Sequence, residues 1–374
     1  MKKKKVIVSV INDLSTDQRV HKVSTTLKKM GFDVLLVGRK QRKSLTLAPR
    51  NYATKRMFLV FEKGILFYVE FQFRLFLFLL FHKADILVAN DLDTLAPNYL
   101  ISKIKNVPVV YDSHEIFTEV PELQQNQVKR KIWLRLEKNI FPKLKTIFTV
   151  NHSIANYFSD LYKVPVNVLR NVPFSKKRET NSIEKNKIFE TDKKIILLQG
   201  AGINIDRGAE ELVEAMQYID VAILVIVGCG DVIPILEKMI VKWKLEKKIF
   251  LTGKIPFEKL SNYTHFADLG VTLDKDTNIN YKFSLPNKVF DYIQAGVPVL
   301  ASDLIELKKI IFQYQVGDCI QNHDPKHIAE KINSIFTDEK LLLKWKENTK
   351  VAAQELCWEN EEKIVIETYQ KFLK

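Results

Sequence analysis

Short apolar segments that alternate with helical stretches constrain the fold of this chain more than any other feature of its sequence. These segments occupy residues 5–11, 32–37, 86–89, 107–111 and 146–150, and then residues 195–199, 222–227, 249–252, 269–273 and 297–301. Near-continuous apolar strands separated by helices are typical of parallel sheets with helices on both faces. The sequence therefore predicts an α/β protein with two Rossmann-like parallel-sheet domains that face a central cleft, where ligands bind at the carboxyl ends of the strands.

A polar stretch divides the two runs of strands. Residues 173–194 have no sustained periodicity, as is typical of a linker. The length of 374 residues also fits two domains. We expect a first domain at residues 1–172, the linker at 173–194, a second domain at 195–356 and a final helix at 357–374.

Positive charge is concentrated in the first half. Residues 1–172 hold 29 Lys and Arg against 14 Asp and Glu, whereas residues 173–374 hold 29 against 30. A half this basic favours an anionic partner, which is membrane lipid, a phosphate-rich substrate or nucleic acid. The chain carries no zinc-finger, helix-turn-helix or RNA-binding signature, so we expect no nucleic-acid partner.

Residues 57–81 are rich in phenylalanine and hold eight of the 23 in the chain. Glu62, Lys63, Glu70 and Arg74 interrupt the stretch, which argues against a helix that spans a membrane. Two interpretations remain, a helix of the core or of a domain interface, and a partly exposed apolar face that enters a membrane interface. Basic residues just before the stretch fit the second: Lys40, Arg42, Lys43, Arg50, Lys55 and Arg56.

The N-terminus and the cysteines favour the cytoplasm. Four lysines precede only six apolar residues before Asn12, which is shorter than the apolar region of a signal peptide. The three cysteines, Cys229, Cys319 and Cys357, are widely spaced and odd in number, which fits a reducing compartment. We expect a cytoplasmic protein that is peripheral on the inner face of a membrane.

The strongest motif is residues 284–299, SLPNKVFDYIQAGVPV. Pro286 is expected at the first position of a helix that Gly296 ends. Lys288 in the first turn can meet a phosphate at the positive end of the helix dipole. Asp291 lies three residues further on the same face, where its carboxylate can accept hydrogen bonds from a ribose diol.

Two glycine-rich turns each follow a strand and open a helix. The first, residues 199–208, places Gly200 where the backbone can approach a ligand, and Arg207 can bind a diphosphate bidentately. The second, residues 227–231, contains Gly228. Neither turn is a dinucleotide fingerprint or a Walker loop, so each taken alone also fits a plain tight turn.

With these motifs the chain resembles the retaining GT-B glycosyltransferases of family 4. The second half matches through residues 199–208, 227–231 and 251–255 and, above all, through residues 284–299. In the first half, residues 109–115 resemble the family's strand-end histidine, and residues 17–20 resemble an acceptor-side loop of one branch. The resemblance covers nearly the whole chain.

The resemblance implies a role for each matched residue. Asp291 binds the ribose of the donor, Arg207 and Lys288 neutralise the diphosphate, and the backbone of Ile255 meets the base. Asn287 also belongs to the donor site. Gly200 and Gly228 line the donor loops, His114 acts beside the bond that breaks, and Asp17 and Arg19 lie on the acceptor side. The first domain then binds the acceptor, the second binds the donor, and the final helix crosses back to the first.

The implied reaction is hexosyl transfer with retention and without a metal or other cofactor. A UDP- or GDP-sugar would donate to a lipid-linked or glycan acceptor in the synthesis of a cell-surface polysaccharide or lipopolysaccharide. Fixed cations stabilise the charge on the leaving diphosphate. Two departures from the family bear on the sugar: Phe283 stands where many members have Glu, and Ala201 where many have a basic residue.

Other interpretations are weighed beside this one. The pairs Asp91–Asp93 and Asp274–Asp276 match a short metal-binding pattern, although helix caps and loop contacts explain them as well. His114 is also compatible with a hydrogen-bonded core histidine. For the whole chain, the alternatives are a sugar-nucleotide epimerase or a phosphorylase of the same fold, and a non-catalytic protein that binds polyanions or membranes.

Overall fold

A computed structural model describes residues 3–15, 17–42, 44, 46–175, 191–255 and 257–373. The chain forms two compact units. Unit 1 comprises Met1–Asn171 and Glu359–Lys374, and unit 2 comprises Val172–Trp358. The expected boundaries at residues 172 and 357 lie within two residues of these limits, whereas residues 176–190 of the expected linker lie outside the described part of the chain.

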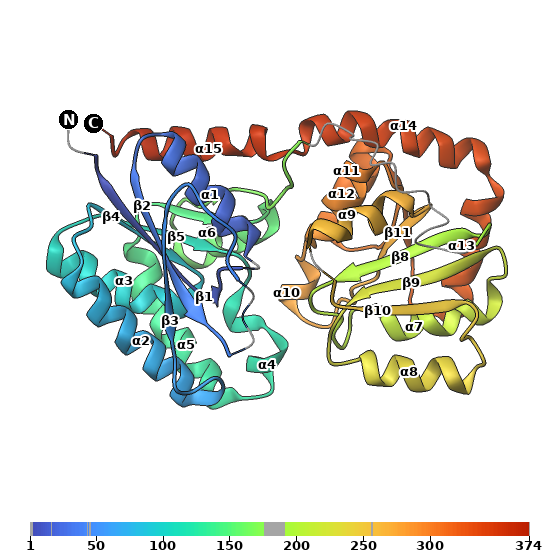
Figure 1. Cartoon of the computed structure of the whole chain (residues 1–374), viewed down its shortest axis with the longest axis horizontal. Helices are drawn as coiled ribbons and strands as arrows, with labels where there is room; N and C mark the ends of the chain where they lie inside the picture. The colour runs from blue at the N-terminus through green and yellow to red at the C-terminus, as the bar shows by residue number, and fades with distance from the viewer. Residues whose placement is uncertain are drawn as a thin grey trace. The chain divides into compact units, whose positions relative to one another are not determined.

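Unit 1 contains a parallel sheet of seven strands in the order β3-β2-β1-β4-β5-β6-β7. Its strands are β1 (Lys5–Asp13), β2 (Asp33–Lys40), β3 (Ala53–Phe58), β4 (Ile86–Asn90), β5 (Val109–Ser113), β6 (Ile147–Thr149) and β7 (Asn167–Val168). Its helices are α1 (Gln18–Lys29), α2 (Gly64–Phe81), α3 (Leu92–Lys105), α4 (Pro121–Gln124), α5 (Gln127–Ile140), α6 (His152–Tyr162) and α15 (Trp358–Gln370). Helices α1 and α15 cover one face of the sheet, and α2, α3 and α5 cover the other (Figure 1).

The direction of strand order reverses at β1 in unit 1. β1 pairs in parallel with β2 on one side and with β4 on the other. Val6, Ile7 and Val8 at its centre are completely buried, as expected for a strand with both faces covered. Loops that follow strands beside such a reversal are where α/β sheets bind ligands, which directs attention to the ends of β4 and β5.

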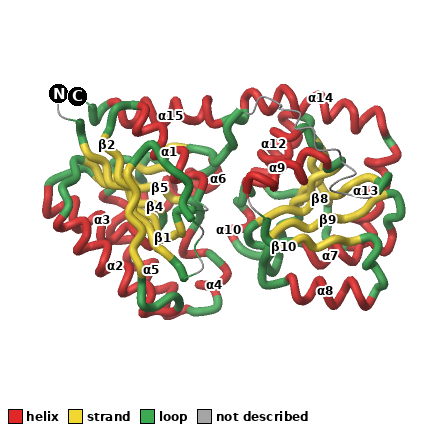
Figure 2. Tube along the Cα trace, viewed as in Figure 1, coloured by secondary structure: helices red, strands yellow, loops and turns green. Residues whose placement is uncertain are grey.

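Unit 2 contains a parallel sheet of six strands in the order β10-β9-β8-β11-β12-β13. Its strands are β8 (Lys194–Gly200), β9 (Ala222–Gly228), β10 (Ile249–Gly253), β11 (Leu269–Thr272), β12 (Val299–Ser302) and β13 (Gly317–Ile320). Its helices are α7 (Ala209–Ala215), α8 (Ile233–Lys242), α9 (Phe257–Phe266), α10 (Ile279–Lys282), α11 (Asn287–Ala295), α12 (Ile305–Tyr314), α13 (Pro325–Thr337) and α14 (Glu339–Glu355). Figure 2 shows the strands of this sheet flanked by helices.

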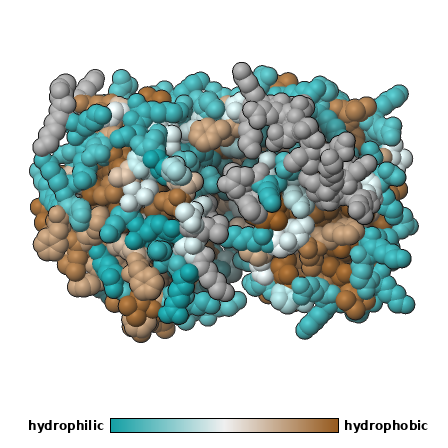
Figure 3. Space-filling view, in the orientation of Figure 1, coloured by the Kyte–Doolittle hydropathy of each residue, from teal (hydrophilic) through white to brown (hydrophobic). Residues whose placement is uncertain are grey.

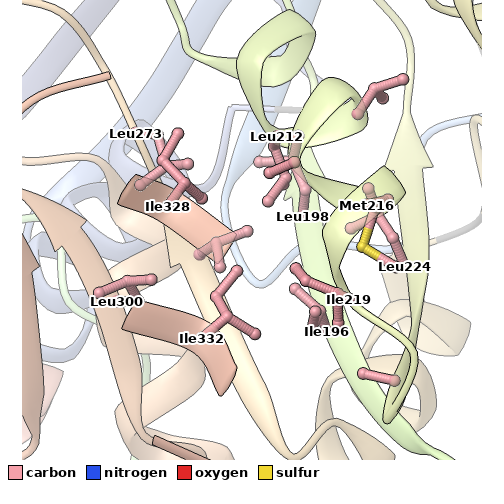
Figure 4. Packing of buried hydrophobic residues seen from close by; sticks show 14 of the residues in the cluster. Ile196, Leu198, Leu212, Met216, Ile219, Leu224, Leu273, Leu300, Ile328 and Ile332 are labelled. Carbon is pink, nitrogen blue, oxygen red and sulfur yellow. The ribbon is translucent and has the colours of Figure 1, made fainter. Parts of the chain in front are cut away.

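Two hydrophobic cores lie on opposite faces of the sheet of unit 2. Successive residues of β8 contribute to them alternately, with Ile196 in one core and Ile195 in the other. The first core joins the sheet to α7 and α13, from which Leu212 and Ile332 point toward the strands (Figure 4). This packing fixes the strand ends from which the donor-side loops emerge.

The last helix belongs mostly to unit 1. Tyr369 of α15 is buried there and packs edge-on against Phe32 and parallel to Phe148, with ring centroids 6.3 and 6.5 Å away. Glu361 forms an ion pair with Arg170, at 2.6 Å between the Oε1 and Nη2 atoms. The C-terminal segment therefore contributes to the hydrophobic core of unit 1, although the other residues of that unit end at Asn171.

The phenylalanine-rich stretch forms β3, a connecting loop and α2. Phe67, Phe71, Leu75 and Leu79 recur at every fourth position of α2 and are buried against the sheet. The other large apolar residues of the helix are exposed or half-buried. By length and composition α2 is long and apolar enough to cross a membrane, and only 22% of the helix is buried. Its buried stripe agrees with the core interpretation, and entry of its exposed side into a membrane interface stays a prediction.

Candidate functional site

The loops that follow β8 and β9 touch each other through their backbones. Gly200 and Gly228 are register partners at the ends of these strands. A Cβ atom on Gly228 would lie 1.8 Å from the carbonyl oxygen of Gly200, and the φ angle of Gly228 is 143°. Only glycine fits at such a position. The two loops therefore pack backbone against backbone at this point, and contact of Gly200 or Gly228 with a ligand stays a prediction.

Two neighbouring side chains fix the orientation of Arg207, which lies in the loop that follows β8. Its Nη1 atom donates to Oδ1 of Asp274 at 2.9 Å, and its guanidinium lies 4.6 Å from the ring centroid of Tyr281. Asp274 is completely buried and also accepts a hydrogen bond from Thr272. The buried carboxylate and the aromatic ring hold Arg207 in one orientation while its charged group remains partly exposed.

Helix α11 presents the central motif. Pro286 is the N-cap residue, with extended backbone, so the expectation that it is the first helical residue is wrong by one position. The reason is that its ψ angle of 135° keeps it outside the helix, which begins at Asn287. Asn287 is exposed, and Lys288 lies half-buried in the first turn as expected. Gly296 ends the helix in a left-handed conformation, also as expected.

The charges of Asp274 and Arg207 both act on Lys288. Burial lowers the pKa of Lys288, the charge of Asp274 raises it, and the charge of Arg207 lowers it again. Two cations beside one carboxylate leave a net positive charge in a partly desolvated place. An anion such as a diphosphate would relieve the repulsion between the two cations, so the electrostatics of this corner of unit 2 favour an anionic ligand.

Asp291 lies one turn after Lys288 on α11 and is half-buried. Its Oδ2 atom accepts a hydrogen bond from Nε2 of Gln199 at 3.3 Å, and Oε1 of Gln199 accepts one from Thr264 at 2.7 Å. The neighbouring Tyr292 is completely buried and its hydroxyl contacts β8 and β11 through backbone groups. The sequence analysis did not assign roles to Gln199, Thr264 or Tyr292; the polar Gln199 at the end of an apolar strand was the available signal.

Three further donor-side positions lie in the loops of unit 2. Ile255 follows β10 and packs, half-buried, against a core cluster, and contact of its backbone with a base stays a prediction. Ala201, where many family members have a basic residue, is exposed immediately after β8. Phe283, where many have glutamate, is the half-buried C-cap residue of α10.

In unit 1, His114 follows β5 and lies between two aspartates. Its Nδ1 atom is 3.1 Å from Oδ2 of Asp91, and its Nε2 atom is 3.6 Å from Oδ2 of Asp112. Its backbone N–H also donates to Asp91 at 2.8 Å. The φ angle of Asp91 is 59°, an uncommon value for a residue other than glycine. Within the described chain, nothing hydrogen-bonds to the buried Nε2 atom.

The charges around His114 favour its protonated form. Burial by itself lowers the pKa of His114, but the carboxylates of Asp91 and Asp112 outweigh it and raise the pKa well above its usual range. Burial likewise raises the pKa of Asp112, but Arg19 and His114 together hold it well below its usual range. These shifts favour the protonated form of His114, whose Nε2 atom lies 3.6 Å from the carboxylate of Asp112.

Arg19 anchors this network. Its side chain is 2% exposed, and it donates to both carboxylate oxygens of Asp112 and to the carbonyl oxygen of Leu169. Direct contact with an acceptor would require Arg19 to leave these partners, and its expected acceptor-side role stays a prediction. Asp17 is the N-cap of α1 and accepts hydrogen bonds from Val20 and Asn12, and its acceptor-side role stays a prediction.

The two acidic pairs that match a metal-binding pattern have other partners. Asp91 bonds to His114, and Asp274 bonds to Arg207 and Thr272. Asp93 is buried in the first turn of α3, and Asp276 forms an ion pair with Lys282. In the part of the chain that the structure describes, no group of three or more His, Cys, Asp or Glu side chains is arranged to hold a metal ion.

Two family models match the chain one after the other. The model described as Glycosyltransferase Family 4 matches residues 17–172, and the model described as Glycosyl transferases group 1 matches residues 180–352. The chain belongs to glycosyltransferase family 4. The first match ends at the boundary of the two units, so each unit corresponds to one half of a family 4 protein.

Solved structures share the fold of this family 4 chain. Sucrose-phosphate synthase of Thermosynechococcus elongatus aligns over 99% of both chains, with 16% identity and a TM-score of 0.81. The Anabaena protein HepE, solved in complex with UDP and glucose, aligns over 98% of this chain and 99% of its own, with 13% identity and a TM-score of 0.76. The sheets of seven and six parallel strands therefore form a GT-B fold.

Two further proteins extend the comparison of this family 4 chain. WaaG, a glycosyltransferase involved in lipopolysaccharide biosynthesis, aligns over 96% of this chain and 98% of its own, with 15% identity and a TM-score of 0.71. In sequence, 188 residues are 24% identical to chitobiosyldiphosphodolichol beta-mannosyltransferase of Candida albicans. That match spans 47% of this chain and 40% of the Candida protein.

Proposed function

We propose that this protein transfers a hexose from a nucleoside-diphosphate sugar to a lipid-linked or glycan acceptor, with retention of anomeric configuration and without a metal. The observation that carries the proposal is the group of Arg207, Lys288 and Asp291 at the carboxyl ends of the strands of unit 2. It combines two cations for a diphosphate with a carboxylate for a ribose. Membership of family 4 supports the same conclusion.

Departure of the nucleoside diphosphate develops negative charge on the leaving oxygens. Arg207 is already oriented by Asp274 and Tyr281, so it needs little reorganisation when that charge appears. The lowered pKa of Lys288 reflects a desolvated ammonium group that gains from an anionic neighbour. These two fixed cations supply the stabilisation that a divalent metal would otherwise provide.

His114 supplies a hydrogen-bond donor for the transfer step. Its raised pKa favours the protonated imidazole, and its Nε2 atom faces Oδ2 of Asp112 at 3.6 Å, which is longer than an ordinary hydrogen bond. We assign the proton on Nε2 to an oxygen of the donor sugar, where it would hold the sugar while the bond to the diphosphate breaks. Retention then follows if the acceptor hydroxyl attacks on the face from which the diphosphate leaves.

The relatives indicate which donor base and which acceptor to propose for this protein. HepE was solved with UDP and glucose, and the Candida relative is a beta-mannosyltransferase, so UDP-glucose and GDP-mannose are the donors to test first. A β-linked mannoside from an α-linked donor means inversion, so the Candida relative supports the donor class and not retention. WaaG acts in lipopolysaccharide biosynthesis, which supports a role in the synthesis of a cell-surface polysaccharide. The basic first half supports a peripheral location on the cytoplasmic face of a membrane.

Product analysis tests this proposal. The purified protein is incubated with UDP-glucose or GDP-mannose and alkyl glycoside acceptors, with EDTA present, and the product is examined by NMR. We expect an α-linked product from one of these α-linked donors. A β-linked product would contradict retention and leave glycosyl transfer in place. Interconversion of the nucleotide sugar without an acceptor would instead favour the epimerase alternative, and turnover only with a divalent metal would contradict metal independence.

A further inference from the structure

Helices α2, α3 and α5 present apolar side chains that the described residues of unit 1 leave exposed. On α2, the large side chains of Ile65, Leu66, Val69 and Phe73 are exposed and share one side of the helix, away from its buried stripe. Leu100 and Ile104 extend the exposed apolar surface on α3, and Val128 and Ile132 extend it on α5. We call these exposed side chains and the lysines and arginines between them the outer helical face.

The three helices are neighbours on one face of the sheet. Tyr68 of α2 packs edge-on against Trp133 of α5, with ring centroids 5.6 Å apart. Figure 1 draws α2, α3 and α5 together below the strands, and Figure 3 shows apolar side chains gathered over the same part of unit 1. Their exposed sides therefore form one continuous surface.

Cations are exposed on this face, and the carboxylates of its three helices are either buried or hydrogen-bonded within unit 1. On α5 the exposed cations are Lys129, Lys131, Arg135 and Lys138. Each of the three helices has one acidic residue. Glu70 accepts hydrogen bonds from the backbone of Val60 and Phe61 and from Arg74, whereas Asp93 and Glu137 are buried. The outer helical face is thus apolar and positively charged.

We propose that the outer helical face is the surface through which this protein docks on an anionic lipid bilayer. The proposal deepens the proposed function, on which it rests, because it says how the enzyme reaches a lipid-linked acceptor. Large apolar side chains interleaved with lysine and arginine are the pattern that binds the headgroup region of anionic membranes. Glu70 adds two more exposed apolar side chains to this surface, because its hydrogen bonds hold the loop in which Val60 and Phe61 are exposed.

Helix α2 lies on the bilayer in this proposal and does not cross it. The helix has three completely buried side chains, Phe71, Leu75 and Leu79. They pack in one hydrophobic core with Ile7 and Leu87 of the sheet. Insertion of the helix across a membrane would remove these side chains and expose the sheet to water. A second copy of the chain fits the face poorly, because two such faces would bring cations together without carboxylates to pair them.

Sedimentation of the full-length protein with lipid vesicles tests the proposal. The protein is expected to sediment with vesicles that contain phosphatidylglycerol, to sediment less with pure phosphatidylcholine, and to be released at high salt. Val69→Ser with Phe73→Ser should abolish sedimentation. Lys131→Gln with Arg135→Gln should lower partitioning about 25-fold, since each cation near an anionic surface is worth roughly a five-fold change.

Matched variants of unit 2 serve as controls. Leu343→Ser with Val351→Ser removes two apolar residues of α14 that are 62% and 60% exposed, and Lys340→Gln with Lys344→Gln removes two exposed cations of the same helix. These four substitutions should leave vesicle binding unchanged. Equal loss in control and test variants, or no binding by the unaltered protein, would overturn the proposal. So would concentration-dependent dimerisation that Phe73→Ser abolishes, because a second copy would then cover the face.

Nucleotide binding separates this proposal from the proposed function. Each variant is also titrated with UDP and GDP, which the outer helical face does not contact in our account. Vesicle binding that is lost while nucleotide binding persists supports docking through this face. A protein that binds vesicles through this face but neither nucleotide would contradict the proposed function and leave the docking surface in place.

Discussion

The charge on His114 depends on carboxylates that come from two different strand ends. Asp91 follows β4, Asp112 lies within β5, and Arg19 of α1 holds Asp112 from the other side. The sequence predicted a role for His114 from the motif that resembles the family. It did not predict the role of Arg19, because 93 residues separate Arg19 from Asp112 and only the folded sheet brings them together.

Replacement of Arg19 with methionine tests this network. Asp112 would remain buried without its cation, and such unpaired buried charges cost about 3–5 kcal/mol of stability. We expect a loss of that size in urea unfolding at pH 7, and partial recovery when Asp112→Asn is added. The control Arg42→Met removes an exposed ion pair with Glu62, which is worth at most about 1 kcal/mol. Equal effects of Arg19→Met and Arg42→Met would show that the network does not stabilise unit 1.

The pKa shifts at this site give stability a pH dependence of known sign. The folded-state pKa of His114 is raised, so the stability that its charge contributes is complete below the pKa of an unfolded histidine and is lost as the pH rises through the folded value. The folded-state pKa of Asp112 is lowered, so its contribution is present above the unfolded value and is lost as the pH falls through the folded one. Both contributions coexist around neutral pH.

At the scale of elements, α5 and α6 are joined by a buried pair. The carboxylate of Glu137 on α5 accepts a hydrogen bond from the hydroxyl of Tyr162 on α6. Burial, with a smaller effect of Glu119, raises the pKa of Glu137 to about 7, although the bond to Tyr162 lowers it. This contact fixes one end of the outer helical face to the body of unit 1.

A pH series with Glu137→Gln tests the state of this pair. Wild-type Glu137 is neutral in the folded state below pH 7 and must lose its proton above it, so the wild type loses stability as the pH rises from about 4.5 to 7. The stability of Glu137→Gln relative to wild type should therefore increase by about 3 kcal/mol over that range. Glu122→Gln, at an exposed position of α4, is the control. A difference that does not change with pH would contradict the raised pKa.

The strands that the sequence did and did not predict differ in the length of their apolar runs. Ten strands were expected near their observed positions because each contains a continuous apolar run. The strands β3, β7 and β13 were missed. Most side chains of β3 are exposed or half-buried, β7 has two residues, and β13 contains Gly317 and Asp318, so none of them has a continuous apolar run. A strand is recognised from sequence by its pattern of apolar residues, and short or edge strands contain too few apolar residues to show that pattern.

The whole molecule consists of two units whose chemistry differs. The sequence predicted this division from the repeat of strands and helices and from the change in charge at residue 172. The residues expected on the donor side of unit 2 were singled out because loops at strand ends carry conspicuous glycines, and because a short motif on one helix holds Lys288 and Asp291. The contacts of Arg207 with Asp274 and Tyr281 were not predicted, since they join residues far apart along the chain.

A calorimetric titration with UDP and with GDP, in the presence of EDTA, tests the central claim most directly. We expect one nucleotide to bind without metal. Asp291→Ala should weaken that binding by about 1.5–3 kcal/mol, the worth of a hydrogen bond to a charged group, while the exposed control Asp303→Ala should not. Metal-free binding of one nucleotide, lost in Asp291→Ala alone, is the result that the account predicts. Binding of neither nucleotide, or equal binding by both variants, would contradict it.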